Sequence, residues 1–192
     1  MDIGLFGGSF NPPHVAHQIV AEVARDQYAL EEVWWIPNST PPHKSDGELA
    51  DVEHRLEMTR RSVAQNPSFR LSEIEIERSG VSYTVDTLRS LQDEHPNTDF
   101  ALIVGSDSLD HFAEWHRPDE IIERVPLIVY KRPGTIGAVA EPRFANQVHF
   151  VSAPVMEVSG SEIRSRRRAG RSIRYMVPES VRRYIEENEL YV

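Results

Sequence analysis

The sequence predicts an α/β fold, in which a doubly wound, mostly parallel sheet of about five to six strands carries helices on both faces. Short apolar runs alternate with segments of helical periodicity along almost the whole chain. Two of these runs, 100–104 and 127–130, resemble strands that are buried on both sides. Alternating strands and helices are typical of parallel β-α-β units.

The first half of the chain contains three predicted strands. Residues 2–6 form a short apolar run, and residues 32–37 form a second run that ends at a proline. Apolar residues recur at helical spacing in 14–28 and again in 52–64, so a helix is expected after each strand. Residues 69–76 alternate between apolar and polar side chains, which predicts a third strand.

The second half continues the alternation. The predicted elements are, in order, a helix at 83–94, strands at 100–105, 126–134 and 148–154, and helices at 160–169 and 178–188. No internal repeat or low-complexity linker divides the chain, so residues 1–192 are expected to form one domain. Trp34 and Trp35 lie in an apolar run and are expected to be packing residues.

Composition narrows the functional classes. Hydrophobic residues make up 40% and charged residues 27% of the 192, which is typical of a folded domain. The chain has no apolar run of about 18 residues and no signal-peptide pattern, so we expect a cytoplasmic protein without a membrane partner. It has no cysteine, which excludes disulfides, thiolate catalysis and cysteine-ligated zinc.

Charge is distributed unevenly. The net charge of −9 disfavours general nucleic-acid binding, but the segment RSRRRAGRSIR at 164–174 holds six arginines and none of the 30 acidic residues. This patch predicts a local anion site. A solvated face or an arm that touches RNA is the alternative.

The stretch GGSFNPPHVAH, from Gly7 to His17, lies between the first strand and the first helix. Glycines allow the backbone to approach a ligand closely, and N–H groups at a helix start favour anions. The Asn-Pro-Pro turn fixes where the helix begins, and His14 and His17 fall on one helical face. Two imidazoles at one spot could donate hydrogen bonds to phosphate oxygens.

Other readings of this stretch are weaker. It lacks the GK[ST] of a Walker A loop and the third glycine of a dinucleotide fingerprint. Zinc would need a third ligand, and none is evident nearby; a surface histidine pair without a role is the remaining alternative.

These residues carry a resemblance. GGSFNPPHVAH is similar to the motif G-[GS]-[ST]-F-[DN]-P-x-H-x-G-H of the nucleotidyltransferases related to class I aminoacyl-tRNA synthetases, with Ala16 in place of the last motif glycine. A second stretch, VSGSEIRSR at 158–166, satisfies a capping box at Ser159 and Glu162. It also resembles the second family motif, I-S-x-[ST]-x-[IV]-R, with Ser161 and Arg164 at the matching positions.

Further stretches resemble the nicotinate-nucleotide adenylyltransferase family. They are PNSTPPHK, SYTVDTL, IVGSDSL, EW and KRPG, in this order along the chain. The resemblance implies a Rossmann-like fold and transfer of AMP from ATP to nicotinate mononucleotide, with release of pyrophosphate, in NAD biosynthesis. It also implies Mg²⁺ held through the phosphates, and a helical part from about 159 to 192 that completes the nucleotide site.

The resemblance assigns roles to residues. Those expected at the reacting phosphates are His14, His17, Lys44 and Arg164. Those expected to bind ATP are Gly7, Gly8, Ser9, Phe10, Gly105, Asp107, Ser159 and Ser161. Those expected to bind the pyridine mononucleotide are Asn38, Tyr83, Thr84 and Trp115. Capping of the next helix is the alternative for Asp107, and a place in the core is the alternative for Trp115.

Three other functions stay open at this point. The enzyme could act on nicotinamide mononucleotide, or on both mononucleotides. The chain could be a degenerate sensor that binds ATP or NAD without chemistry, with Ala16 as the sign of decay. RNA binding through 164–174 would predict a salt-sensitive affinity. A homo-oligomer is compatible with all of them.

Ala16 gives the first testable prediction. Alanine suits helical backbone angles well, so Ala16→Gly should leave turnover within about tenfold of the native value. Steady-state rates of the two proteins measure this. A rise of several orders of magnitude in the variant would instead identify the native chain as a weakened member of the family.

Overall fold

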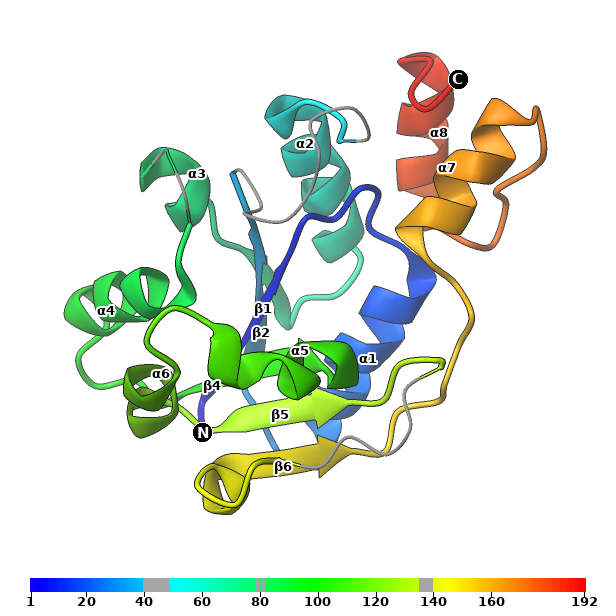
Figure 1. Ribbon diagram of the computed structural model, residues 1–192. Coiled ribbons are helices and arrows are strands. Elements are labelled where there is room, and N and C mark those ends of the chain that lie inside the picture. Colours follow the sequence, from blue (N-terminus) through cyan, green and yellow to red (C-terminus); the bar gives the residue numbers. More distant parts are fainter. Residues whose placement is uncertain (40–48, 79, 81, 135–139) are drawn as a thin grey trace.

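A computed structural model describes the chain except for residues 40–48, 79, 81 and 135–139 (Figure 1). In the described part, six strands form one sheet in the order β3-β2-β1-β4-β5-β6. The strands are β1 (Ile3–Gly8), β2 (Glu32–Pro37), β3 (Phe69–Leu71), β4 (Phe100–Gly105), β5 (Leu127–Tyr130) and β6 (Val148–Val151). All neighbouring pairs are parallel, which confirms the predicted sheet.

Helices cover both faces of this sheet (Figure 1). The main helices are α1 (Val15–Gln27), α2 (Val52–Val63), α4 (Thr84–Glu94), α6 (Pro118–Arg124), α7 (Gly160–Arg168) and α8 (Glu179–Glu187). Successive residues of β1 serve opposite faces, because Leu5 belongs to a core cluster with α4 and α6 while Phe6 belongs to a cluster with α1. The predicted doubly wound arrangement is therefore confirmed.

The last two helices form a third cluster away from the sheet. Ile163 of α7 and Val181 and Ile185 of α8 are fully buried together with Met58 of α2. The helical part that follows residue 159 thus packs beside α2 (Figure 1). This packing brings the start of α7 to the edge of the sheet where β1 ends.

The chain first adds strands on one side of β1, where β2 and β3 lie, and then on its other side, where β4 to β6 lie. The order of the strands therefore reverses at β1. In open α/β sheets, ligands bind at the carboxyl ends of the strands beside such a reversal. At this edge the two strands end in glycine, Gly8 in β1 and Gly105 in β4. The fold therefore places a ligand site at the end of β1.

Several boundaries differ from the sequence prediction. The strands expected over 126–134 and 148–154 are shorter and end at Tyr130 and Val151. The strand expected over 69–76 ends at Leu71, and residues Ile74–Arg78 form the short helix α3. In a run of this length, alternating Glu and Ile satisfy helical and strand periodicity equally well. In addition, β3 is an edge strand of the described sheet and pairs with β2 alone, so fewer hydrogen bonds extend it. The strand expected over 2–6 continues to Gly8, so Gly7 and Gly8 belong to β1 and not to the loop after it.

Short helices follow β4 that sequence periodicity did not predict. They are α5 (Ser106–Asp110), the 3-10 turn Phe112–Glu114 and α6. Elements of three to seven residues contain too few turns to show a periodic pattern. By contrast, the expectation that Trp34 and Trp35 are packing residues is confirmed, since their exposed fractions are 4% and 0%.

None of the described helices combines the length and the apolar character needed to cross a lipid bilayer.

Candidate active site

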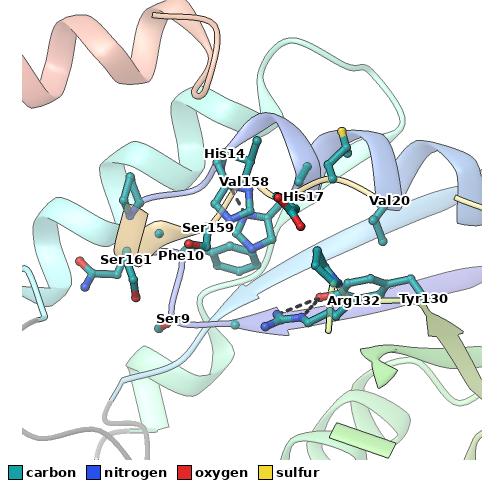
Figure 2. A pocket seen from close by; sticks show the side chains of 18 of the residues that line it. Ser9, Phe10, His14, His17, Val20, Tyr130, Arg132, Val158, Ser159 and Ser161 are labelled. Atoms are coloured by element: carbon teal, nitrogen blue, oxygen red, sulfur yellow. Dashed lines mark hydrogen bonds between the residues drawn. The ribbon is translucent and has the colours of Figure 1, made fainter. Parts of the chain in front are cut away.

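A cavity of about 550 Å³ opens where β1 ends (Figure 2). Three parts of the chain line it: the segment from the end of β1 into α1, the residues that follow β5, and the approach to α7 with its first turn. The predicted site residues in its wall are Gly7, Gly8, Ser9, Phe10, His14, His17, Ser159, Ser161 and Arg164. The two motifs at opposite ends of the sequence therefore meet in one cavity.

The loop after β1 is fixed from below by aromatic packing. Phe10 adopts a left-handed φ of 43°, and its ring is buried and stacked on Trp35 with 5.1 Å between ring centroids. An added Cβ on Gly8 would lie 3.3 Å from that ring, which leaves little room for any other residue there. This packing holds the backbone of the loop against the floor of the cavity.

The two histidines stack on each other. Their ring centroids are 3.6 Å apart and the ring planes differ by 20° (Figure 2). The backbone N–H of His14, the N-cap residue of α1, donates to Nδ1 of His17 over 3.1 Å. Because Nδ1 of His17 is an acceptor, the proton of its neutral ring resides on Nε2, which is then a donor.

His14 is held in its neutral form. Its exposed fraction is 7%, and burial together with the positive charge of Arg132 lowers its pKa to about 3. Its Nδ1 is buried and has no hydrogen-bond partner among the described residues. A buried ring nitrogen without a partner is costly unless a ligand satisfies it, and such groups mark functional sites.

The start of α7 forms another part of the cavity wall. Ser159 caps the helix by accepting from the N–H of Glu162 over 3.2 Å, so the predicted helix cap at Ser159 is confirmed. Arg164 is 6% exposed and donates to the carbonyl of Asn11 over 2.9 Å. Gly160 permits this approach, because a Cβ there would lie 2.8 Å from the same carbonyl oxygen.

Gly105 and Asp107 lie beside the cavity without lining it. Asp107 is inside α5 and its Oδ2 forms an ion pair with Arg132 over 3.1 Å, while Gly105 is the N-cap residue. The alternative reading of Asp107 as a helix cap is therefore wrong. An added Cβ on Gly105 would overlap Oδ1 of Asp107 and lie 2.8 Å from Nε of Arg132. Glycine at this position therefore leaves the space in which Asp107 and Arg132 form their ion pair.

The residues expected on the mononucleotide side lie outside the lining of this cavity. Asn38 follows β2, and its N–H donates to the carbonyl of Gly8 over 3.0 Å. Tyr83 is the N-cap residue of α4, directly before Thr84, and its ring lies 4.4 Å from that of His116. Trp115 precedes His116 and packs on Phe112, so these residues gather near the start of α4. Lys44 lies outside the described residues.

Several residues without an expected role line the cavity, and two of them shape it most directly. Arg132 lines the cavity and donates to the hydroxyl of Tyr130 over 3.0 Å, and Gly160 sets the distance between α7 and the first loop. The position of Arg132 just past a buried parallel strand was a usable signal. Gly160 gave no signal, because only the packed structure shows what its missing side chain would hit. Ala16 lines the cavity as the second residue of α1.

Comparison with known proteins agrees with this geometry. The cytidylyltransferase-like family matches residues 5–166. A probable nicotinate-nucleotide adenylyltransferase of Salinibacter ruber is 71% identical over 191 residues, covering 100% of this chain and 98% of that protein. The nicotinate-nucleotide adenylyltransferase of Bacillus subtilis is 38% identical over 189 residues, covering 98% and 97%.

A solved structure shares the fold. The nicotinic acid mononucleotide adenylyltransferase of Plasmodium falciparum, complexed with NaAD, superimposes with a TM-score of 0.82 at 21% identity, covering 99% of this chain and 97% of that one. At this identity the likeness establishes the sheet and its helices.

The close approach of α7 to the first loop gives a testable prediction. Gly160→Ala should push the start of α7 away from Asn11 and destabilise the fold by about 1–3 kcal/mol, the usual cost of overpacking. Affinity for inorganic pyrophosphate should fall about tenfold, because Arg164 moves with the helix and a charge-assisted contact contributes roughly 1.5–3 kcal/mol.

Thermal unfolding and calorimetric titration with pyrophosphate measure both effects. Ser165→Ala, at an exposed position of the same helix, is the matched control and should change neither. Unaltered pyrophosphate affinity in Gly160→Ala would show that α7 does not form part of an anion site.

Proposed function

The chain belongs to the cytidylyltransferase-like family, and we propose that it is a nicotinate-nucleotide adenylyltransferase. It transfers AMP from ATP to the phosphate of nicotinate mononucleotide and releases pyrophosphate, which yields nicotinate adenine dinucleotide for NAD biosynthesis. One observation carries this proposal: the stacked histidines and the buried Arg164 converge on one cavity at the end of β1.

The reaction needs no nucleophilic side chain. A phosphate oxygen of nicotinate mononucleotide forms the new bond to the α-phosphorus of ATP, and the bond from that phosphorus to the bridging oxygen breaks. The electron pair leaves with pyrophosphate. The protein therefore contributes alignment of two polyanions and stabilisation of the charge that builds on the transferred phosphoryl group.

His14 and His17 are proposed to stabilise that charge. Nε2 of His17 is a donor because Nδ1 is occupied by the N–H of His14, so the ring offers its proton towards a phosphate without first being charged. The buried Nδ1 of His14 is the second polar atom available at this place. Two preoriented rings cost little reorganisation when the transition state forms.

Arg164 and the start of α7 are proposed to hold the departing pyrophosphate. Nη1 of Arg164 is fixed by the carbonyl of Asn11, which orients its planar fork, and Ser161 is 3.4 Å from Nη2. A helix N-terminus adds favourable potential for an anion. Gly7, Gly8, Ser9 and Phe10 are proposed to contribute backbone to the ATP site, and Ser159 shapes the helix start through its cap.

Arg132 is proposed to act on the phosphates from the part of the cavity wall that follows β5. It is anchored by Tyr130 and Asp107 and lines the same cavity as the histidines (Figure 2). A guanidinium held by two neighbours loses little conformational freedom when it binds an anion. Asp107, and Gly105 next to it, are proposed to contact the ATP ribose from beside the cavity.

The mononucleotide is proposed to bind between β2 and the start of α4. Thr84 is the first residue of α4, where N–H groups have no partner within the helix, so a pyridine carboxylate would find donors there. Trp115 offers an indole face for the pyridine ring, and Asn38 lies next to Gly8 of the ATP site. Lys44 is proposed to neutralise the phosphate of the mononucleotide.

Mg²⁺ fits this site as a companion of ATP. Among the described residues, no group of three His, Asp or Glu side chains could bind a metal ion by itself. The cavity wall carries Lys131, Arg132 and Arg164 and a single carboxylate, Glu157. We propose that phosphate oxygens and water supply most of the ligands, and that the ion neutralises phosphate charge when it is bound.

Substrate preference gives the first test of the proposal. With ATP, nicotinate mononucleotide should be converted with a kcat/KM roughly 10- to 100-fold higher than nicotinamide mononucleotide, because hydrogen bonds to a charged group contribute about 1.5–3 kcal/mol. Release of pyrophosphate from each pair measures this. Equal rates would replace the proposal by a dual-specificity enzyme, and no pyrophosphate from either pair would indicate a nucleotide-binding sensor.

His17→Ala tests the role of the imidazole. The transfer rate should fall by about 10²-fold or more, the scale for loss of a preorganised donor to developing charge. The fold should persist, with only the loss of one N-terminal helix contact, worth about 1 kcal/mol. Pyrophosphate release at saturating substrates and thermal unfolding measure the two effects.

His111→Ala is the matched control, because that side chain is 70% exposed and the residue does not line the cavity. It should leave the transfer rate unchanged. A loss below about threefold in His17→Ala would refute the proposed role, since even one weak donor contributes more.

A further inference from the structure

Arg55 is a buried cation that the reaction scheme above does not use. It lies in the first turn of α2 and its exposed fraction is 2%. No carboxylate forms an ion pair with it in the part of the chain that the structure describes, and burial lowers its pKa. Burying a guanidinium without an anionic partner is expensive, so its hydrogen bonds must account for its place in the fold.

Four backbone carbonyls surround the guanidinium. Nε donates to Ala50 over 3.1 Å, Nη1 donates to Ser9 over 3.1 Å and to Asn38 over 2.7 Å, and Nη2 donates to Ser39 over 2.7 Å. One planar group thus binds three separate stretches of chain. Lysine could not reproduce this, because it offers a single charged nitrogen at the end of a flexible stem.

These carbonyls belong to both halves of the proposed site. Ser9 is part of the loop that lines the ATP cavity. Asn38 and Ser39 are the residues that leave β2 on the mononucleotide side, and Ala50 is where the chain returns to α2. Arg55 therefore connects the backbone of the ATP loop with the backbone of the mononucleotide segment.

The ATP loop has other supports that do not involve Arg55. Asn11 accepts from Arg164 through its carbonyl, and its Oδ1 accepts from the hydroxyl of Tyr191 over 2.8 Å. The ring of Phe10 is locked against Trp35. Apart from its contact with Arg55, Asn38 reaches the end of β1 through its N–H, which donates to the carbonyl of Gly8 over 3.0 Å. Loss of Arg55 should consequently affect the mononucleotide side more than the ATP side.

We propose that Arg55 is a positioning residue that sets the distance between the two bound substrates by fixing the carbonyls of Ser9, Asn38 and Ser39 on one guanidinium. The inference rests on the proposed function. In-line transfer between two phosphates is sensitive to placement, and an error of about 1 Å can reduce the rate 10²-fold. Arg55 acts through the backbone and does not touch the reacting atoms.

Arg55→Lys tests this role, with Arg60→Lys as the matched control. Arg60 is exposed on the same helix and binds Glu57 and Glu73 on the surface. In Arg55→Lys, kcat should fall roughly 10- to 100-fold and KM for nicotinate mononucleotide should rise about tenfold, while KM for ATP stays within about threefold. Arg60→Lys should leave all three constants unchanged.

A second variant guards against a failure to fold. Arg55→Met removes the charge and so does not bury an unsatisfied ammonium, and it should show the same unequal change in the two KM values. Thermal unfolding accompanies the kinetics. Equal changes in both KM values, unchanged kinetics, or loss of folding in both variants would each overturn the proposal, because Arg55 would then serve only the fold.

Failure of the proposed function is visible separately. It would appear as absence of the dinucleotide product in the unaltered protein and in Arg60→Lys, and the role of Arg55 would fall with it. If the native protein is active and Arg55→Lys has the same kinetic constants, the positioning role alone is rejected.

Discussion

The contact between Arg164 and the carbonyl of Asn11 joins two parts of the chain that are 153 residues apart in sequence. The shape of the cavity depends on it, because it sets the start of α7 against the loop that precedes the histidines. The contact is possible because position 160 lacks a side chain and Ser159 starts the helix there. The anchor under α7 is the cluster of Ile163 with α2 and α8. Hydrophobic packing of Ile163 thus fixes the helix that carries the neighbouring Arg164.

The cavity concentrates positive charge inside an acidic protein. The chain as a whole carries a net charge of −9, whereas Lys131, Arg132 and Arg164 line the cavity. Salt screens exposed charges beyond about 8–10 Å at physiological ionic strength, so the acidic surface does little to repel a nucleotide that has reached the mouth. Within the cavity the arginines are fixed by neighbouring groups. Neutral histidines add donors there without adding repulsion between cations.

Two buried arginines donate hydrogen bonds to backbone carbonyl oxygens among the described residues. Arg55 binds four of them, and Arg164 binds that of Asn11. A carbonyl leaves the positive charge of the arginine uncancelled, whereas a carboxylate would neutralise it. At Arg55 the carbonyls therefore orient the guanidinium without cancelling its positive charge. These hydrogen bonds also fix the spacing between the backbone segments that Arg55 contacts. Through them α2 influences a site that it does not line.

The sequence by itself determined the sheet, the two motifs and the chemistry of the first loop. Strand and helix periodicity, the glycines before a helix and the spacing of His14 and His17 are local properties, and local sterics set them wherever the chain folds. It failed where periods are short, as in Ile74–Arg78, and it gave no role to Gly160, Arg55 or Arg132. Those roles depend on strand order and on the docking of α7 and α8 beside α2. Only the tertiary structure decided them, because each role depends on a contact between residues far apart in the chain. Such contacts form only when packing of the core brings those residues together.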